Sequence, residues 1–125
     1  MTQQRHELSL QRQPVEVGRA RRHVAQVFAD VHEDARSTLQ MLTSEIVTNA
    51  IAHGEGEIVL RTSRAHGEAR IEVLDDSARA PQLGAAAADA EGGRGLMLVE
   101  ALSSAWGVRR IPGRTGKSVW FTLGL

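Results

Sequence analysis

The sequence predicts an α/β fold, a two-layer sandwich in which a mixed, mostly antiparallel sheet carries its helices on one face. Three observations predict it. Apolar residues recur at helical spacing in some segments and alternate with polar ones in others. Two strand-like segments, 57–63 and 68–76, are joined by "RAHG", which is short enough for an antiparallel hairpin. The order along the chain is strand, two helices, two strands, loop, helix and two strands.

The N-terminal half contains the first strand and two helices. Residues 7–12, "ELSLQR", alternate as a short half-buried strand does. After Pro14, helical spacing connects Val17, Ala20, Val24, Val27, Phe28 and Val31. A second helix is predicted from Asp34 to His53, and Gly54 is well placed to end it. The buried stripe of this helix consists of Leu39, Leu42, Ile46, Val47 and Ala50.

The C-terminal half begins with a long loop. Segment 77–92 lacks apolar periodicity, and a loop of this length inside a compact domain is usually functional or mobile. A helix is predicted to open directly after Gly93 and Gly95, with an apolar stripe of Leu96, Leu98, Val99 and Leu102. Two closing strands follow, "WGVRRI" and "KSVWFTLGL", and the turn-like "PGRTG" joins them.

The composition limits the classes of protein to consider. A chain of 125 residues fits a single domain over 1–125. Its 15 basic and 15 acidic side chains cancel, so no overall field recruits nucleic acid or a membrane surface. The absence of cysteine excludes disulfides and thiolate sites. No apolar run approaches a membrane span of about 20 residues, and the N-terminus lacks a signal-peptide core, so we expect a cytoplasmic protein.

Three polar residues share one face of the second helix, because Glu45, Asn49 and His53 are four residues apart. Asn49 offers a neutral oxygen to Mg²⁺, and Glu45 could accept a proton from a hydroxyl group. A solvated surface is the alternative explanation for both. We interpret His53 as a structural residue at the helix end.

Two further motifs suit a nucleotide. Asp75 ends an apolar strand, and an ionised carboxylate only accepts hydrogen bonds, which suits the amino group of adenine. An ordinary Asp-rich turn is the alternative. The stretch "EGGRGL" at 91–96 leads into a helix, where backbone N–H groups and the helix dipole attract phosphate. Glycines that only shape a turn would give the same pattern.

As an ordered set, these motifs resemble the GHKL superfamily of ATP-binding domains, which have the Bergerat-type fold. The resemblance is greatest to the stand-alone anti-sigma-factor serine/threonine kinases and their actinobacterial relatives, and it covers residues 8–125. "EIVTNAIAH" resembles the helix motif of that family, "VLDDS" its adenine motif, "GGRGL" its phosphate motif and "TGKSVWFTL" its last strand.

The resemblance implies a role for each motif. Asn49 would bind Mg²⁺, Asp75 would bind the adenine amino group with Ser77 beside it, and Glu45 would be the catalytic base. The nucleotide phosphates would meet the helix start, formed by Gly93, Arg94, Gly95 and Leu96. Segment 77–92 would be the nucleotide lid.

The sequence departs from the family pattern at three positions. Ser77 and Arg79 stand where the adenine motif usually has glycines. Glu91 stands where the kinases carry an arginine that reaches the γ-phosphate, and Arg94 could replace that arginine from inside the motif.

Two functions follow as hypotheses. The first is an anti-sigma factor with kinase activity, which binds a sigma factor and phosphorylates the anti-sigma-factor antagonist, with ATP and Mg²⁺ as cofactors. The alternative is a non-catalytic, ATP-gated module that binds a regulatory protein. Glu45 favours the kinase and Glu91 the module. A sensor histidine kinase fragment is disfavoured, because no phospho-acceptor helix hairpin precedes the domain. The resemblance also implies a homodimer.

Overall fold

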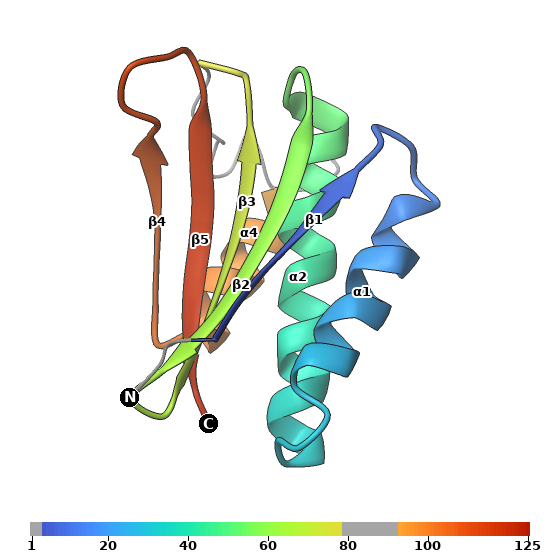
Figure 1. Ribbon diagram of the computed structural model, residues 1–125, viewed down its shortest axis with the longest axis vertical. Helices are drawn as coiled ribbons and strands as arrows, with labels where there is room; N and C mark the ends of the chain where they lie inside the picture. The colour runs from blue at the N-terminus through green and yellow to red at the C-terminus, as the bar shows by residue number, and fades with distance from the viewer. Residues whose placement is uncertain (1–3, 79–92) are drawn as a thin grey trace.

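The computed structural model describes residues 4–78 and 93–125. A five-stranded sheet forms one layer and the helices form the other (Figure 1). The elements in chain order are β1 (Gln4–Leu10), α1 (Glu16–Val27), α2 (Glu33–His53), β2 (Ile58–Ala65), β3 (Glu68–Asp75), α4 (Gly93–Leu102), β4 (Ala105–Arg110) and β5 (Lys117–Gly124).

The strand order is β1-β2-β3-β5-β4, and all four neighbouring pairs are antiparallel. The predicted fold class is therefore confirmed, with no parallel pair among the described strands. The first strand differs from the predicted 7–12 range, because its pairing with β2 extends from Gln4 opposite Arg64 to Leu10 opposite Ile58. Pairing with a neighbour, which local alternation does not show, sets these bounds.

The β2–β3 hairpin has the predicted tight connection. His66 and Gly67 both have positive φ, 55° and 76°, which is the backbone of a two-residue type I′ turn. This turn has the twist that its flanking strands need, and it fixes the register in which Ala65 lies opposite Glu68.

The hydrophobic core lies between the helices and one face of the sheet. Its largest fully buried side chains include Phe28 just after α1, Leu42 and Ile46 of α2, and Phe121 of β5. The whole predicted stripe of α2 is buried, so that prediction is confirmed. Burial of this apolar area holds α2 against β3 and β5, which positions the polar residues of α2.

Helix α4 differs from its prediction in two respects. It begins at Gly93 itself and not after Gly95, so both glycines lie in its first turn. Leu96 and Val99, three residues apart, are buried, whereas Leu98 and Leu102 are 36% and 44% exposed. The helix contacts α2 and β4 along the narrower side that Leu96 and Val99 occupy.

The opposite face of the sheet carries a polar cluster around Glu72. The Ser118 hydroxyl donates to Glu72 Oε2 at 2.6 Å, and Arg70 Nε lies 3.3 Å from Glu72 Oε1. The Arg70 guanidinium also stacks over the Trp120 ring, 4.3 Å from its centroid. Burial raises the pKa of Glu72, but the Ser118 hydrogen bond and the arginine charges outweigh it and lower the pKa below the usual value. This cluster joins β3 to β5.

The Glu72 cluster predicts a pH-dependent contribution to stability. The pKa of Glu72 is lower in the folded protein than in the unfolded chain. The stabilisation by its ionised carboxylate is therefore complete above about pH 4.5 and is lost as the pH falls through the folded-state pKa. At pH 7, Glu72→Gln should lower the free energy of unfolding by about 1–2 kcal/mol. Urea unfolding at pH 7 and at lower pH measures it. A difference between the two proteins that does not shrink at low pH would contradict this account.

Candidate functional site

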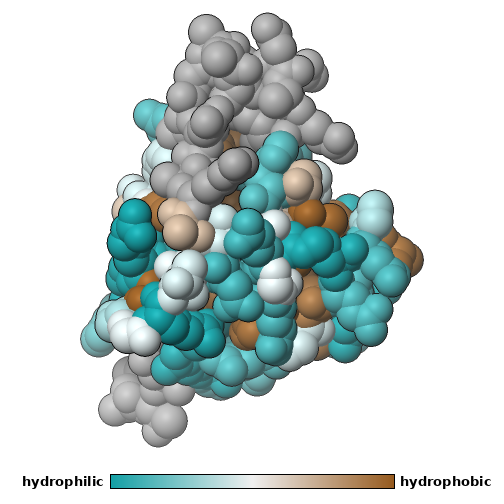
Figure 2. Space-filling view, turned by 90° about the horizontal axis from the view of Figure 1, so that it is seen from above, coloured by the Kyte–Doolittle hydropathy of each residue, from teal (hydrophilic) through white to brown (hydrophobic). Residues whose placement is uncertain are grey.

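Two of the predicted site residues, Asp75 and Ser77, lie beside the end of α2 at one end of the sheet, the upper end in Figure 1. Here α2 ends at His53, β3 ends at Asp75 and β5 begins at Lys117. Loop 54–57 crosses this end between α2 and β2. Figure 2 shows the same end from above, where the surface of the described residues is mainly hydrophilic, with hydrophobic residues in separate patches.

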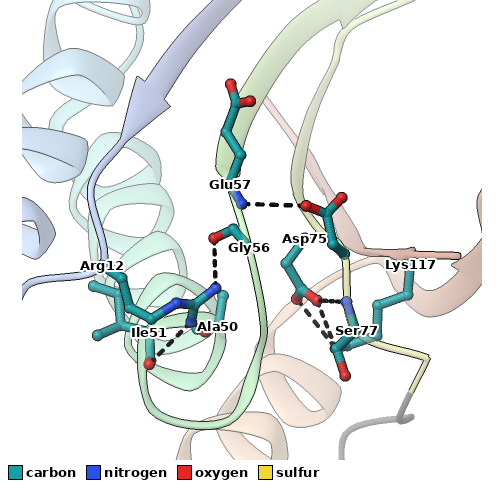
Figure 3. A network of polar contacts seen from close by, with 9 residues as sticks. Arg12, Ala50, Ile51, Gly56, Glu57, Asp75, Ser77 and Lys117 are labelled. Carbon is teal, nitrogen blue, oxygen red and sulfur yellow. Dashed lines mark hydrogen bonds and ion pairs between the residues drawn. The ribbon is translucent and has the colours of Figure 1, made fainter.

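Asp75 is the centre of this end. It is only 2% exposed, and it lies on the helix-covered face because it continues the alternation of Ile71 and Val73. Lys117 Nζ lies 3.1 Å from each carboxylate oxygen, and the Ser77 backbone N–H donates to Oδ1 at 2.7 Å (Figure 3). A buried carboxylate with a cation and a backbone donor is held in one orientation.

Gly54 ends α2, as predicted, and it also lies against Asp75. Its backbone is extended and not left-handed, with φ −84° and ψ −174°. A Cβ at this position would lie 2.5 Å from the Ala50 carbonyl oxygen and 2.8 Å from Asp75 Oδ2. Glycine is therefore needed here for the close approach of the helix end to the carboxylate.

We predict that Gly54→Ala destabilises the protein by about 1–3 kcal/mol, because the helix end or the Asp75 carboxylate must move. Urea unfolding measures the change. Gly18→Ala is the matched control: Gly18 lies inside α1, and its Cβ would approach only the flexible ends of the Arg22 and Arg21 side chains, at 3.3 and 3.8 Å. The control should be neutral or stabilising. If Gly54→Ala is as stable as the wild type, the close approach is not a constraint.

Arg12 ties the same loop to the helix. Its guanidinium donates to the carbonyl oxygens of Ala50 and Ile51 at the end of α2, and to Gly56 O at 2.8 Å (Figure 3). The carbonyl oxygens of Ala50 and Ile51 belong to the last turn of α2, where Ala50 O also accepts from the Gly54 N–H, and a cation is favourable at this negative end of the helix dipole. Arg12 thereby fixes the position of loop 54–57.

The side chain of Asp76 holds the other side of this loop. The Glu57 N–H donates to Asp76 Oδ2 at 3.3 Å, and the Asp76 N–H donates to Glu55 O at 2.8 Å. Gly56 has φ +67°, and a Cβ there would collide with the Asp76 carboxylate. The two consecutive acidic residues therefore have different functions: Asp75 faces the helix end and Asp76 shapes the loop.

The polar face of α2 extends from the helix end beside Asp75 back along the helix. Asn49 is buried at 8% exposure, Glu45 is half-buried, and His53 is exposed at the helix end. The side chains of Glu45 and Asn49 form no hydrogen bond with the described residues. A buried amide normally has a partner, so Asn49 is available to a ligand or to water.

The remaining predicted residues are described only in part. The backbones of Gly93, Arg94 and Gly95 form the first turn of α4, but the structure does not describe the Arg94 side chain. Leu96 packs in the core. Ser77 is buried beside Asp75. Arg79, Glu91 and most of the predicted lid lie in 79–92, outside the described residues.

Sequence reasoning missed Lys117 and Arg12. Lys117 is the only lysine in the chain and opens the last strand, directly after Gly116, which was a usable signal. Arg12 lies 38 residues from Ala50 in sequence, and only the fold shows that it reaches the end of α2. Among the described residues, no group of three or more histidine, aspartate or glutamate side chains could bind a metal ion.

Comparison with known protein families shows the class of domain to which this fold belongs. The chain belongs to the family of histidine kinase-like ATPase domains, whose model matches residues 10–123. This is the GHKL family that the sequence motifs resemble, and it is a family of ATP-binding domains.

Two solved structures have a similar fold. The first contains the RsbU and RsbW domains of Rv1364c from Mycobacterium tuberculosis, with a TM-score of 0.73 and 21% identity over 98% of this chain. The second is the histidine kinase domain of the blue-light activated histidine kinase EL346 from Erythrobacter litoralis, with a TM-score of 0.54 and 23% identity over 90% of this chain. The aligned region spans 32% and 60% of those chains.

No curated protein matches the chain. Among the described helices, none is long and hydrophobic enough to cross a membrane.

Proposed function

We propose that the protein is an ATP-binding serine/threonine protein kinase and an anti-sigma factor, whose substrate is an anti-sigma-factor antagonist. The family supports ATP binding, and the similarity in fold to a structure that contains an RsbW domain supports this type of regulator. The observation that carries the proposal is the face of α2, where Asn49 and Glu45 have no hydrogen bond to the described protein and lead toward the buried Asp75.

The spacing along α2 fits a nucleotide. With a rise of 1.5 Å per residue, Asn49 lies about 7.5 Å and Glu45 about 13 Å along the helix axis from Gly54, which contacts Asp75. If the adenine of ATP binds at Asp75, the phosphates would lie near Asn49, with the γ-phosphate toward Glu45. The α4 N-terminus, formed by Gly93, Arg94 and Gly95, supplies backbone N–H groups to the same phosphates.

The residues present fit a magnesium ion that is bound mainly by phosphate and water. Mg²⁺ commonly keeps several waters and takes one or two protein oxygens beside substrate phosphates. The side-chain oxygen of Asn49 would supply one such ligand. A bound Mg²⁺ would neutralise phosphate charge during transfer.

Glu45 is the proposed general base. Its carboxylate accepts the proton of a serine or threonine hydroxyl on the substrate protein, and that oxygen forms a bond to the γ-phosphorus. The bond from the γ-phosphorus to the β–γ bridging oxygen breaks, and ADP leaves with the electron pair. The half-buried carboxylate of Glu45 has no partner among the described residues, so it is free to accept this proton.

The sequence of the phosphate motif supports a second candidate function. Glu91 occupies the position at which the related kinases carry an arginine, and it favours a non-catalytic, ATP-gated module that binds a regulatory protein. Arg94 would have to supply the missing positive charge for transfer to occur. Both candidates share the ATP site and differ only in the chemistry that follows binding.

Incubation with labelled ATP, Mg²⁺ and candidate antagonist proteins separates the two functions. The kinase proposal expects label on a serine or threonine of one antagonist, and no label when Mg²⁺ is chelated. ATP binding and ATP-dependent binding of a verified partner without any label would establish the module instead.

A further inference from the structure

The ion pair between Lys117 and Asp75 is buried at the end of the sheet where the nucleotide base is proposed to bind. Lys117 is 7% exposed and Asp75 is 2% exposed. The two residues lie opposite each other on β5 and β3, on the face that the helices cover. Burying an ammonium group is costly unless its charge is paired and its N–H groups are hydrogen-bonded, so each N–H donor of Lys117 needs an acceptor.

The hydrogen-bonding capacity of the pair is not exhausted. An ammonium group has three N–H donors, and that of Lys117 donates one hydrogen bond to Asp75 Oδ1 and lies 3.1 Å from Oδ2 as an ion-pair contact. Among the described residues, no other acceptor contacts Lys117 Nζ. Oδ1 of Asp75 also accepts from the Ser77 N–H, whereas Oδ2 has the ion-pair contact with Lys117 and accepts no hydrogen bond from the described donors. One donor and one acceptor position therefore remain side by side.

We infer that Lys117 is a specificity-determining residue that donates to the N1 atom of adenine while Asp75 accepts from the 6-amino group. Adenine presents an amino donor next to a ring-nitrogen acceptor, and the ion pair offers the complement of both. Guanine presents the reverse order, a carbonyl acceptor at position 6 and an N–H at position 1. This inference rests on the proposed ATP site and adds a second contact to the base.

Lys117 also explains how a carboxylate can serve at a buried position. Without Lys117, a buried Asp75 carboxylate could accept a hydrogen bond from the adenine amino group, but its charge would be costly to bury. The ammonium compensates that charge and supplies a donor that the carboxylate lacks. A role in charge compensation alone is the competing explanation, and it makes no contact with the base.

Nucleotide analogues test the inference on the wild-type protein. Calorimetric titration would compare ATP with 1-deaza-ATP, which keeps the amino group but lacks the N1 acceptor. We expect 1-deaza-ATP to bind roughly 10- to 100-fold more weakly, as for loss of a hydrogen bond to a charged donor. 3-Deaza-ATP, which retains N1, is the control analogue and should not show that loss. Equal affinity for ATP and 1-deaza-ATP would overturn the inference.

The variant Lys117→Met provides a second test of the inference. Lys117→Met should bind ATP and 1-deaza-ATP with equal affinity, since the donor to N1 is gone. Arg110→Met is the matched control, because exposed Arg110 lies opposite Lys117 on β4 and should not change the discrimination. Retention of the full discrimination in Lys117→Met would also overturn the inference.

The single lysine gives a readout that does not require a variant. Selective isotopic labelling of lysine yields one side-chain ammonium resonance, that of Lys117. This resonance should shift on saturation with ATP, and it should shift less with 1-deaza-ATP. An unchanged resonance in the ATP complex would overturn the inference and leave the proposed function intact. Failure of ATP to bind at all would instead contradict the proposed function.

Discussion

Replacing Glu45 with alanine should leave ATP binding nearly unchanged and reduce phosphoryl transfer by about 10²- to 10⁴-fold. The loss follows from the role of the carboxylate, which accepts a proton only when a hydroxyl attacks the γ-phosphorus. The measurement is phosphate incorporation into a cognate antagonist, together with the affinity of each variant for ATP. Glu45→Gln, which keeps the shape but removes the charge, should lose nearly as much transfer.

Two comparisons make this result specific. Glu33→Gln changes an exposed glutamate in the first turn of the same helix and should keep full transfer. Asn49→Ala should lose Mg²⁺-dependent ATP binding and transfer together, because the proposed site places Asn49 beside the phosphates. Full transfer by Glu45→Ala would exclude Glu45 as the base. Under the module hypothesis, Glu45→Ala would have no consequence for partner binding.

The second large effect is expected at the buried ion pair. Lys117→Met should lower the free energy of unfolding by about 3–5 kcal/mol, because it leaves the Asp75 carboxylate buried without its cation. Urea unfolding followed by circular dichroism measures this change. The double variant Asp75→Asn/Lys117→Met should be more stable than the single variant, since no buried charge is left uncompensated.

A surface ion pair provides the control for this effect. Arg109 lies 3.7 Å from Glu72 Oε2, but its side chain is 58% exposed. Arg109→Met should therefore cost less than about 1 kcal/mol. If Lys117→Met costs no more than Arg109→Met, Asp75 does not depend on Lys117 for charge compensation.

The parts of the fold that depend on local pattern could be predicted from the sequence. The buried stripe of α2 follows a period of 3.6 residues, and the tight β2–β3 connection ends in a glycine. The polar face of α2 also follows from spacing alone, and it carries the candidate site residues Glu45 and Asn49. The exposure of Leu98 could not be predicted, because it depends on which side of α4 meets α2.

The interactions that complete the site are long-range in sequence. Lys117 and Asp75 are 42 residues apart, and the order of β3 and β5 in the sheet brings them together. Arg12 reaches the end of α2 because β1 pairs with β2 at the edge of the sheet. Glu72 illustrates the same limit: its alternation predicts a polar sheet face, but its burial depends on Ser118 and Arg70.

Calorimetric titration of the wild type and Asp75→Asn with ATP–Mg²⁺ and GTP–Mg²⁺ tests the central claim most directly. Circular dichroism should first establish that the variant is folded at the temperature used. We expect the wild type to prefer ATP, and Asp75→Asn to bind ATP roughly 10- to 100-fold more weakly, with less discrimination against GTP. Equal affinity of the two proteins for ATP, or a wild type that prefers GTP, would contradict the assignment of this end of the sheet as the adenine site.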